Sequence, residues 1–393
     1  MTATAGRLPG ARLDEAPALP DYETASLAQL LPSAAGSVGV TGFRDVLGLG
    51  AHPRVCTVLV DGLGARLLGE RGGHAPFLRR AGGNQPDGVP VELRTAVPST
   101  TATALATLGT GCAPGQHGVI GYRAFRPGTT DVVNHLAWPA DLDPTTWQPA
   151  RTVFERVAAD GVSATMVGPA AFEGSGLTRA ALRGPAYARA ETLEQRVDAA
   201  VAALHASPRA LVNVYWGDID KTGHARGWLS HEWALQLERI DAALQALRRR
   251  APKDALVVVT ADHGMVDCPR GSMLDVAQHP HLRTDVLGTA GEPRLVQLRV
   301  APGTADLVAA RWRDVLGDRA WVLTCDEALT AGWFGAGADP ALMARVGEVL
   351  VAARGDLAVV DTGSDDRAAL SMVGQHGSVT DAETAVPLLR LSA

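Results

Sequence analysis

Three short apolar runs, each followed closely by an aspartate, constrain the fold of this chain more than any other feature. The runs VCTVLV (55–60), ALVNVY (210–215) and ALVVVT (255–260) are rich in β-branched residues. Continuous runs of this kind are typical of parallel strands that are buried on both faces of a sheet. Because open α/β sheets bind ligands at the carboxyl ends of their strands, we expect three carboxylates at one sheet edge: Asp61, Asp220 and Asp262.

Helical patterns alternate with these strands. Residues 152–158, 193–204 and 233–249 have helical apolar spacing, and weaker strands are expected at 94–97, at 163–167 and near 386–391. Strands that alternate with helices favour an α/β fold with a doubly wound, mostly parallel central sheet flanked by helices. Residues 122–150 show no clear period and are expected to be irregular.

The pattern changes after residue 267. We expect strands at 294–300, 321–324 and 357–361, and helices at 304–316 and 341–353. These elements predict a small inserted α+β lobe at about residues 270–370. Residues 1–20 are rich in Pro, Gly and Ala and are expected to be a loose leader, whereas residues 21–393 are expected to form a single domain.

Composition excludes several classes of protein. The net charge of −6 argues against a partner that is a nucleic-acid polymer. The four cysteines form no CxxC pair, which argues against a disulfide framework or a cysteine-based zinc site. The N-terminus lacks a signal-peptide core and no run of 18 apolar residues occurs, so we expect a cytoplasmic protein without a membrane partner. The oligomeric state is left open.

Histidines accompany the three aspartates. His224 lies four residues after Asp220, His263 is adjacent to Asp262, and His376 begins a His-Gly pair. Carboxylate and imidazole together are ligands that suit Zn²⁺ or a similar ion. Six ligands exceed what one tetrahedral zinc ion needs, but they fit a pair of divalent ions. Each residue also has an ordinary structural interpretation, as a helix cap or a core histidine, and the residues alone leave both open.

A cluster of hydroxyls precedes a short helical run. Ser99, Thr100 and Thr101 stand just before the small apolar residues 102–108. Hydroxyls at this position usually cap the helix. A hydroxyl there can also act as a nucleophile, since free N–H groups and the positive end of the helix point toward the group it attacks.

These motifs resemble the alkaline phosphatase superfamily, and most closely its type I phosphodiesterase/nucleotide pyrophosphatase family. The resemblance covers roughly residues 50–390. It is carried by VLVDG around Asp61, by Thr101 at fixed offsets before Gly111 and His117, by D-x-x-G-H from Asp220, by ADHGM around Asp262, and by His376-Gly377.

The resemblance implies an alkaline phosphatase-like catalytic domain with two zinc sites. One site would use Asp220, His224 and His376, and the other Asp61, Asp262, His263 and the hydroxyl of Thr101. It further implies a metal-dependent hydrolase of small phosphoric esters, acting on phosphodiester or pyrophosphate bonds through a phosphothreonine intermediate on Thr101.

The substrate side departs from the family pattern. Ala102 and Ala104 stand where nucleotide pyrophosphatases usually have an aromatic residue and an asparagine. Ala102 therefore marks an altered substrate contact, and Asn134 is a candidate for the missing amide. A phosphomonoesterase, a phosphonate (C–P) hydrolase of the same superfamily and a non-catalytic metal-bound protein remain as alternatives.

Overall fold

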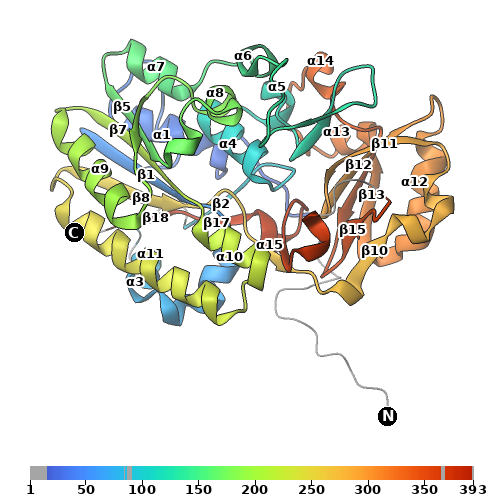
Figure 1. Cartoon of the computed structure of the whole chain (residues 1–393). Helices are drawn as coiled ribbons and strands as arrows, with labels where there is room; N and C mark the ends of the chain where they lie inside the picture. Colours follow the sequence, from blue (N-terminus) through green and yellow to red (C-terminus); the bar gives the residue numbers. More distant parts are fainter. Residues whose placement is uncertain (1–15, 84, 86–90, 364–367, 392–393) are drawn as a thin grey trace.

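A six-stranded, mostly parallel sheet forms the larger part of the molecule. The computed structural model describes residues 16–83, 85, 91–363 and 368–391 (Figure 1). The strand order is β18-β8-β1-β7-β5-β6, and only the edge strand β18 runs antiparallel to its neighbour. This arrangement confirms the predicted fold class. The strands are β1 (Arg54–Val60), β5 (Ser163–Gly168), β6 (Ala186–Arg189), β7 (Ala210–Trp216), β8 (Ala255–Thr260) and β18 (Leu389–Leu391).

The three acid-bearing strands lie side by side at the centre of this sheet. β1 pairs with β7 on one side and β8 on the other, and Arg54 is level with both Ala210 and Ala255. Almost every residue of these strands is buried, as expected for β-branched side chains between two helical layers. Because the strands start level, their carboxyl ends also meet at one level, and the aspartates follow there.

Helices cover both faces of the sheet. Helices α9 (Leu193–Ala206) and α11 (His231–Arg250) pack on one face, and α1 (Leu30–Ser37) and α7 (Val153–Ala159) pack on the other (Figure 1). The hydroxyl of Ser230 caps α11 by accepting the N–H of Trp233. The apolar stripe of α11 is buried at the predicted positions Leu237, Ile240, Leu244 and Leu247. Trp233 is buried there as well, whereas Leu235, which the sequence also predicts on the stripe, is 42% exposed.

A second, antiparallel sheet lies within the 270–370 range where the lobe is expected. Its order is β11-β12-β14-β13, and α12 (Ala305–Leu316) packs against it. The predicted helix at 341–353 is wrong, because only α14 (Pro340–Met343) is helical and the run VLVAA forms a central strand of this sheet. Short apolar runs do not distinguish a strand from a helix by periodicity. The strands are β11 (Val286–Glu292), β12 (Leu295–Val300), β13 (Ala320–Thr324) and β14 (Val349–Ala353).

Smaller differences concern element ends. The strand expected at 94–97 is β2 (Glu92–Arg94), which pairs with β17 (Ala385–Pro387). The irregular stretch 122–150 contains a hairpin of β3 (Arg123–Phe125) and β4 (Val132–Asn134). Residues 1–15 of the predicted leader lie outside the described residues, and the single-domain boundaries stay predictions. Other elements are α2 (Ala65–Arg71), α3 (Pro76–Gly83), α4 (Thr101–Thr110), α5 (Pro114–His117), α6 (Pro144–Trp147), α8 (Gly176–Ala181), α10 (Asp218–Arg226), α13 (Cys325–Thr330), α15 (Asp381–Thr384), β9 (Val266–Asp267), β10 (Met273–Asp275), β15 (Ala358–Val360) and β16 (Gly374–Gln375).

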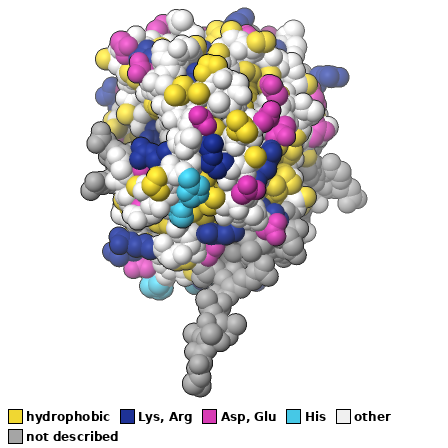
Figure 2. All heavy atoms as spheres, turned by 90° about the vertical axis from the view of Figure 1, so that its right-hand side faces the viewer, with side chains coloured by type: hydrophobic (Ala, Val, Ile, Leu, Met, Phe, Trp, Pro, Cys, Tyr) yellow, Lys and Arg dark blue, Asp and Glu magenta, His cyan; other side chains and the backbone are white. Residues whose placement is uncertain are grey.

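The surface at the lobe end of the molecule carries charges of both signs. In Figure 2, Lys and Arg side chains on this face are interspersed with Asp, Glu and hydrophobic side chains. Neither sign of charge dominates the face that is seen there. Among the described residues, no helix is both long and apolar enough to cross a membrane.

Candidate active site

The hydroxyl of Thr101 stands at the first residue of α4. Thr100 is the N-cap residue in extended conformation, and its side chain makes no capping hydrogen bond. Thr101 Oγ1 lies 3.3 Å from His263 Nε2. The first N–H groups of a helix have no partner within the helix, so this hydroxyl sits beside donors that suit an anion.

Close backbone packing brings the aspartates at the strand ends together. Gly62 has a φ of +77°, and a Cβ at this position would lie 3.0 Å from the Cβ of Asp220. A Cβ at Gly64 would lie only 2.6 Å from the Cα of Gly264. Glycine at these positions therefore lets the loop after β1 approach both neighbouring loops, because a larger residue would clash with their backbones or side chains.

All three histidines are oriented by backbone carbonyl groups. The Nδ1 atoms of His224, His263 and His376 lie 2.7–2.9 Å from the carbonyl oxygens of Gly374, Gly264 and Ser99, respectively. A carbonyl oxygen only accepts hydrogen bonds, so each Nδ1 carries the hydrogen. The lone pair of each neutral ring is then on Nε2, which is the usual arrangement for histidine ligands of a metal ion.

These Nε2 atoms face carboxylate oxygens. His224 Nε2 lies 3.3 Å from Asp220 Oδ2, and His263 Nε2 lies 3.4 Å from Asp61 Oδ1 and 3.5 Å from Asp262 Oδ2. Within the described part of the chain, one buried oxygen of each of the three aspartates has no hydrogen-bond partner. Lone pairs that face one another in a buried site repel unless a cation lies between them. The donor set therefore fits divalent cations.

The ligand atoms form two overlapping groups. Asp220, His224 and His376 make one group, and Asp61, Asp220 and His263 make the other, each with ligand atoms within 4.8 Å of one another. The first group has the composition predicted for one zinc site. The second contains Asp61 and His263 as predicted but includes Asp220. Asp262 lies beside this second group, with its Oδ2 3.5 Å from His263 Nε2.

The crowding of acids is reflected in their pKa values. Burial and the nearby carboxylates of Asp262 and Asp220 raise the pKa of Asp61 well above its usual range. Burial alone would raise the pKa of Asp220 as well, but the adjacent His224 lowers it below the usual range. These opposite shifts show a site in which the negative charges require positive partners.

Tyr215 is a site residue that sequence reasoning missed. Its hydroxyl donates a hydrogen bond to Asp61 Oδ2, which leaves Asp61 Oδ1 to face His263. Its ring makes an edge contact with Phe172, with centroids 5.7 Å apart. In the sequence, Tyr215 is one more residue of an apolar strand, so no local signal identifies it.

We expect Tyr215→Phe to lower the affinity for Zn²⁺ about 10- to 100-fold, because loss of a hydrogen bond to a ligand typically has this effect. Titration with a competing zinc chelator measures the affinity. Thermal unfolding of the metal-free protein serves as the control for packing, which the phenyl ring preserves. Unchanged zinc affinity would mean that Asp61 is held without Tyr215.

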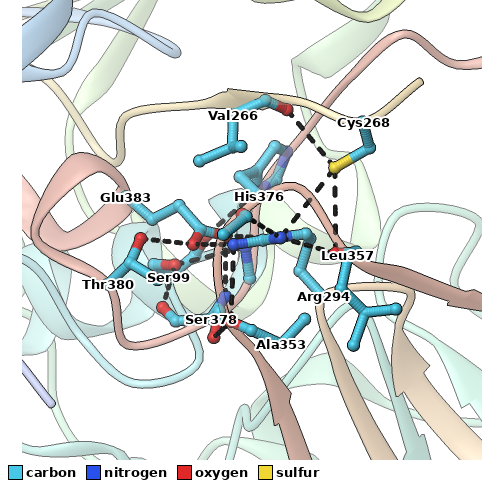
Figure 3. Close-up of polar contacts among 12 residues, drawn as sticks. Ser99, Val266, Cys268, Arg294, Ala353, Leu357, His376, Ser378, Thr380 and Glu383 are labelled. Carbon is cyan, nitrogen blue, oxygen red and sulfur yellow. Dashed lines mark hydrogen bonds and ion pairs between the residues drawn. The ribbon is translucent and has the colours of Figure 1, made fainter. Parts of the chain in front are cut away.

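A buried ion pair is connected to the candidate site through hydrogen bonds. The guanidinium of Arg294 donates to both carboxylate oxygens of Glu383, at 3.0 and 2.7 Å, and both side chains are fully buried (Figure 3). Arg294 also donates to the carbonyl oxygens of Gly355 and Leu357, at 2.8 and 2.5 Å. The pair joins the start of β12, in the lobe, to α15, beside the main sheet.

The same network reaches a candidate metal ligand. Glu383 accepts the N–H of Ser378 at 3.0 Å, and the carbonyl oxygen of Ser378 accepts the hydroxyl of Ser99 at 2.6 Å. The carbonyl oxygen of Ser99 in turn accepts Nδ1–H of His376 (Figure 3). Ser99 therefore does not cap α4. It connects the loop that precedes Thr101 to the loop that carries His376.

A cavity of about 780 Å³ opens over these residues. Its walls include Asp61, Thr101, Asp220, His224 and His376.

The two predicted substrate contacts, Ala102 and Asn134, are not among the residues that line this cavity. The Ala102 side chain is fully buried, and Asn134 uses its amide locally. Its Nδ2 donates to the Tyr122 hydroxyl, and its Oδ1 accepts the N–H groups of Leu136 and Ala137. These local bonds argue against a substrate contact by Asn134, which stays a prediction. His117 is also fully buried and bonds to Thr107.

Glu292 is a buried acid on the cavity wall. Burial raises its pKa to about 8, although the N–H of Tyr122 and the charge of Arg123 oppose this shift. Its Oε2 accepts that N–H at 2.7 Å, and its Oε1 has no hydrogen-bond partner among the described residues.

We expect Glu292→Gln to change the pH dependence of stability. Between the unfolded pKa near 4.5 and the folded pKa near 8, the native state keeps a proton that the unfolded state loses. The stabilisation is complete below pH 4.5 and is lost as pH rises to 8. The free energy of unfolding of wild type should therefore fall by about 1.4 kcal/mol per pH unit relative to the variant over this range. Urea unfolding at several pH values measures the difference, and parallel curves would contradict it.

The chain is similar to one family in sequence and to several solved proteins in fold. A model of the type I phosphodiesterase/nucleotide pyrophosphatase family matches residues 55–379. Human ectonucleotide pyrophosphatase/phosphodiesterase 5 aligns over 86% of this chain and 87% of its own, with a TM-score of 0.66 and 18% identity. The murine protein, inactive and in complex with AMP, aligns over the same shares with a TM-score of 0.67 and 17% identity.

Phosphonoacetate hydrolase from Sinorhizobium meliloti, in complex with phosphonoacetate, has a similar fold. It aligns over 86% of this chain and 89% of its own, with a TM-score of 0.65 and 18% identity. No curated protein matches the chain. At these identities, the solved structures establish a shared fold.

Proposed function

Because the chain belongs to the type I phosphodiesterase/nucleotide pyrophosphatase family, we propose that it hydrolyses phosphodiester or pyrophosphate bonds of small molecules. Thr101 is the nucleophile, and two divalent metal ions are the cofactors. Mixed carboxylate and imidazole ligands favour Zn²⁺. The predicted ligands are the side chains of Asp61, Asp220, His224, Asp262, His263 and His376 together with the hydroxyl of Thr101.

One observation carries this proposal. Thr101 is the first residue of α4, and its hydroxyl lies 3.3 Å from His263 Nε2. The lone pair of this nitrogen also faces the carboxylates of Asp61 and Asp262. A threonine hydroxyl alone is a poor nucleophile. Bound divalent ions supply the missing activation, since they lower the pKa of a hydroxyl and neutralise phosphoryl charge.

Thr101 and the start of α4 then have separate roles in the reaction. Thr101 Oγ1 forms a bond to phosphorus while the bond from phosphorus to the leaving oxygen breaks, which gives a phosphothreonine. Water hydrolyses this intermediate and restores the hydroxyl. N–H groups at the start of α4 donate to the phosphoryl oxygens, whose negative charge grows during attack.

Hydrolysis of bis-p-nitrophenyl phosphate, p-nitrophenyl phosphate and phosphonoacetate by the zinc-loaded protein tests the proposal. We expect the diester to have the highest kcat/KM, and chelation to abolish turnover until zinc is restored. A higher kcat/KM for the monoester would make the protein a phosphomonoesterase, and release of phosphate from phosphonoacetate alone would make it a C–P hydrolase. Turnover that survives chelation would contradict the metal-dependent mechanism.

A further inference from the structure

The wall of the cavity beside Thr101 is apolar. Leu105 lies one helical turn after Thr101 and therefore on the same face of α4. Beyond it, Met166 of β5 and Leu177 and Leu182 of α8 and its C-cap line the same cavity. The apolar surface thus begins next to the nucleophile, where a substituent of the reacting phosphorus would lie.

Two hydroxyls on this wall, those of Ser175 and Tyr215, donate hydrogen bonds within the protein. The hydroxyl of Ser175 donates to Thr178 Oγ1 at 3.0 Å and accepts the N–H of Thr178 at 3.3 Å, as the cap of α8. The hydroxyl of Tyr215 donates to Asp61. A site that selects a base or a sugar needs hydrogen-bonding groups directed at them. The hydroxyls of Ser175 and Tyr215 on this wall are therefore directed at neighbouring protein groups rather than into the cavity.

The mouth of the cavity exposes large apolar side chains. Leu136 is 55% exposed and Phe172 is 37% exposed, and both line the cavity. Exposed apolar surface that continues into a pocket is typical of a binding site for an apolar group. The cavity volume of about 780 Å³ lies within the 300–1,000 Å³ range of sites that enclose drug-sized molecules, well beyond the needs of a phosphate group.

We propose that this wall binds an alkyl ester group of the substrate, so that the enzyme prefers alkyl phosphodiesters to nucleotide esters. This inference rests on the proposed function and specifies its substrate class. The alkyl group stays on phosphorus during the first step, in which the other ester oxygen leaves and Thr101 Oγ1 takes its place. Each methylene that the wall removes from water contributes about 0.8 kcal/mol, which corresponds to about fourfold in kcat/KM.

A series of p-nitrophenyl esters with one common leaving group tests the preference. Methyl, butyl and octyl p-nitrophenyl phosphates are compared with p-nitrophenyl thymidine 5′-phosphate on the zinc-loaded protein, at concentrations below micelle formation. We expect kcat/KM to rise about two- to fourfold per methylene along the series and to exceed that of the thymidine ester. A flat series, or a thymidine ester that is the best substrate, would overturn the inference.

Variants separate the wall from the rest of the molecule. Leu177→Gln and Phe172→Ser should each lower the octyl-to-methyl ratio of kcat/KM at least tenfold. Leu235→Gln, at a 42% exposed position on α11, is the matched control and should keep the wild-type ratio. Melting temperatures establish that each variant is folded. A wild-type ratio in both wall variants would contradict the assignment of the alkyl group to this wall.

Calorimetric binding of methylphosphonate and octylphosphonate separates failure of this inference from failure of the proposed function. Tighter binding of octylphosphonate, with a negative heat-capacity change, supports the apolar wall even when no diester is hydrolysed. Equal affinities in a protein that does hydrolyse diesters would overturn the alkyl preference and leave the proposed function intact.

Discussion

Thr101→Ala should lower kcat for the diester by about 10⁴-fold or more and leave zinc binding largely intact. Loss of a nucleophile removes the covalent route altogether, and effects of this order or larger are typical of such variants. The other predicted ligands come from loops that the substitution does not touch. Steady-state hydrolysis of bis-p-nitrophenyl phosphate, together with measurement of bound zinc, tests both parts.

Two control variants sharpen this prediction. Thr101→Ser keeps a hydroxyl and should retain a measurable part of the activity. Thr100→Ala removes the neighbouring hydroxyl, which makes no capping bond to the helix, and should have a small effect. If Thr101→Ala kept its activity while Thr100→Ala lost it, Thr100 would be the nucleophile. Loss of zinc from Thr101→Ala would instead assign the hydroxyl a mainly ligating role.

Arg294→Met should lower the free energy of unfolding by about 3–5 kcal/mol. The substitution leaves Glu383 as a buried carboxylate without its cationic partner, and removal of one member of a buried pair has costs of this size. The remaining donors to Glu383 are the N–H of Ser378 and the hydroxyl of Thr380, both of them neutral. Urea unfolding of the metal-free protein measures the effect apart from zinc binding.

The matched control is the exposed pair of Arg189 and Glu173, whose side chains are 68% and 36% exposed. Arg189→Met should change stability by less than about 1 kcal/mol, because surface ion pairs contribute little. The double variant Arg294→Met/Glu383→Leu should recover part of the loss, since it leaves no unpaired charge. An Arg294→Met protein as stable as Arg189→Met would show that the buried pair does not hold the lobe to the main sheet.

The strands that carry the site were predictable because they are long, β-branched and buried on both faces. Once three such strands each preceded an acid, the parallel topology placed the acids at one edge, and the structure has β7, β1 and β8 adjacent and level. The helix predicted at 341–353 failed for the opposite reason. The run VLVAA is short, and its strand conformation depends on pairing with β12 and β13.

The sequence by itself determined the α/β class, the three acid-bearing strands and the set of residue types that can hold metal ions, because these depend on local periodicity and on motifs within a few residues. Only the tertiary structure decided the roles of Tyr215, Glu292 and the Arg294–Glu383 pair. It also decided which oxygens lack partners and which side chains wall the cavity. Those properties arise from contacts between segments that are distant in the chain. Burial then changes which charge state and which hydrogen-bond partner a side chain has, compared with the same side chain in water.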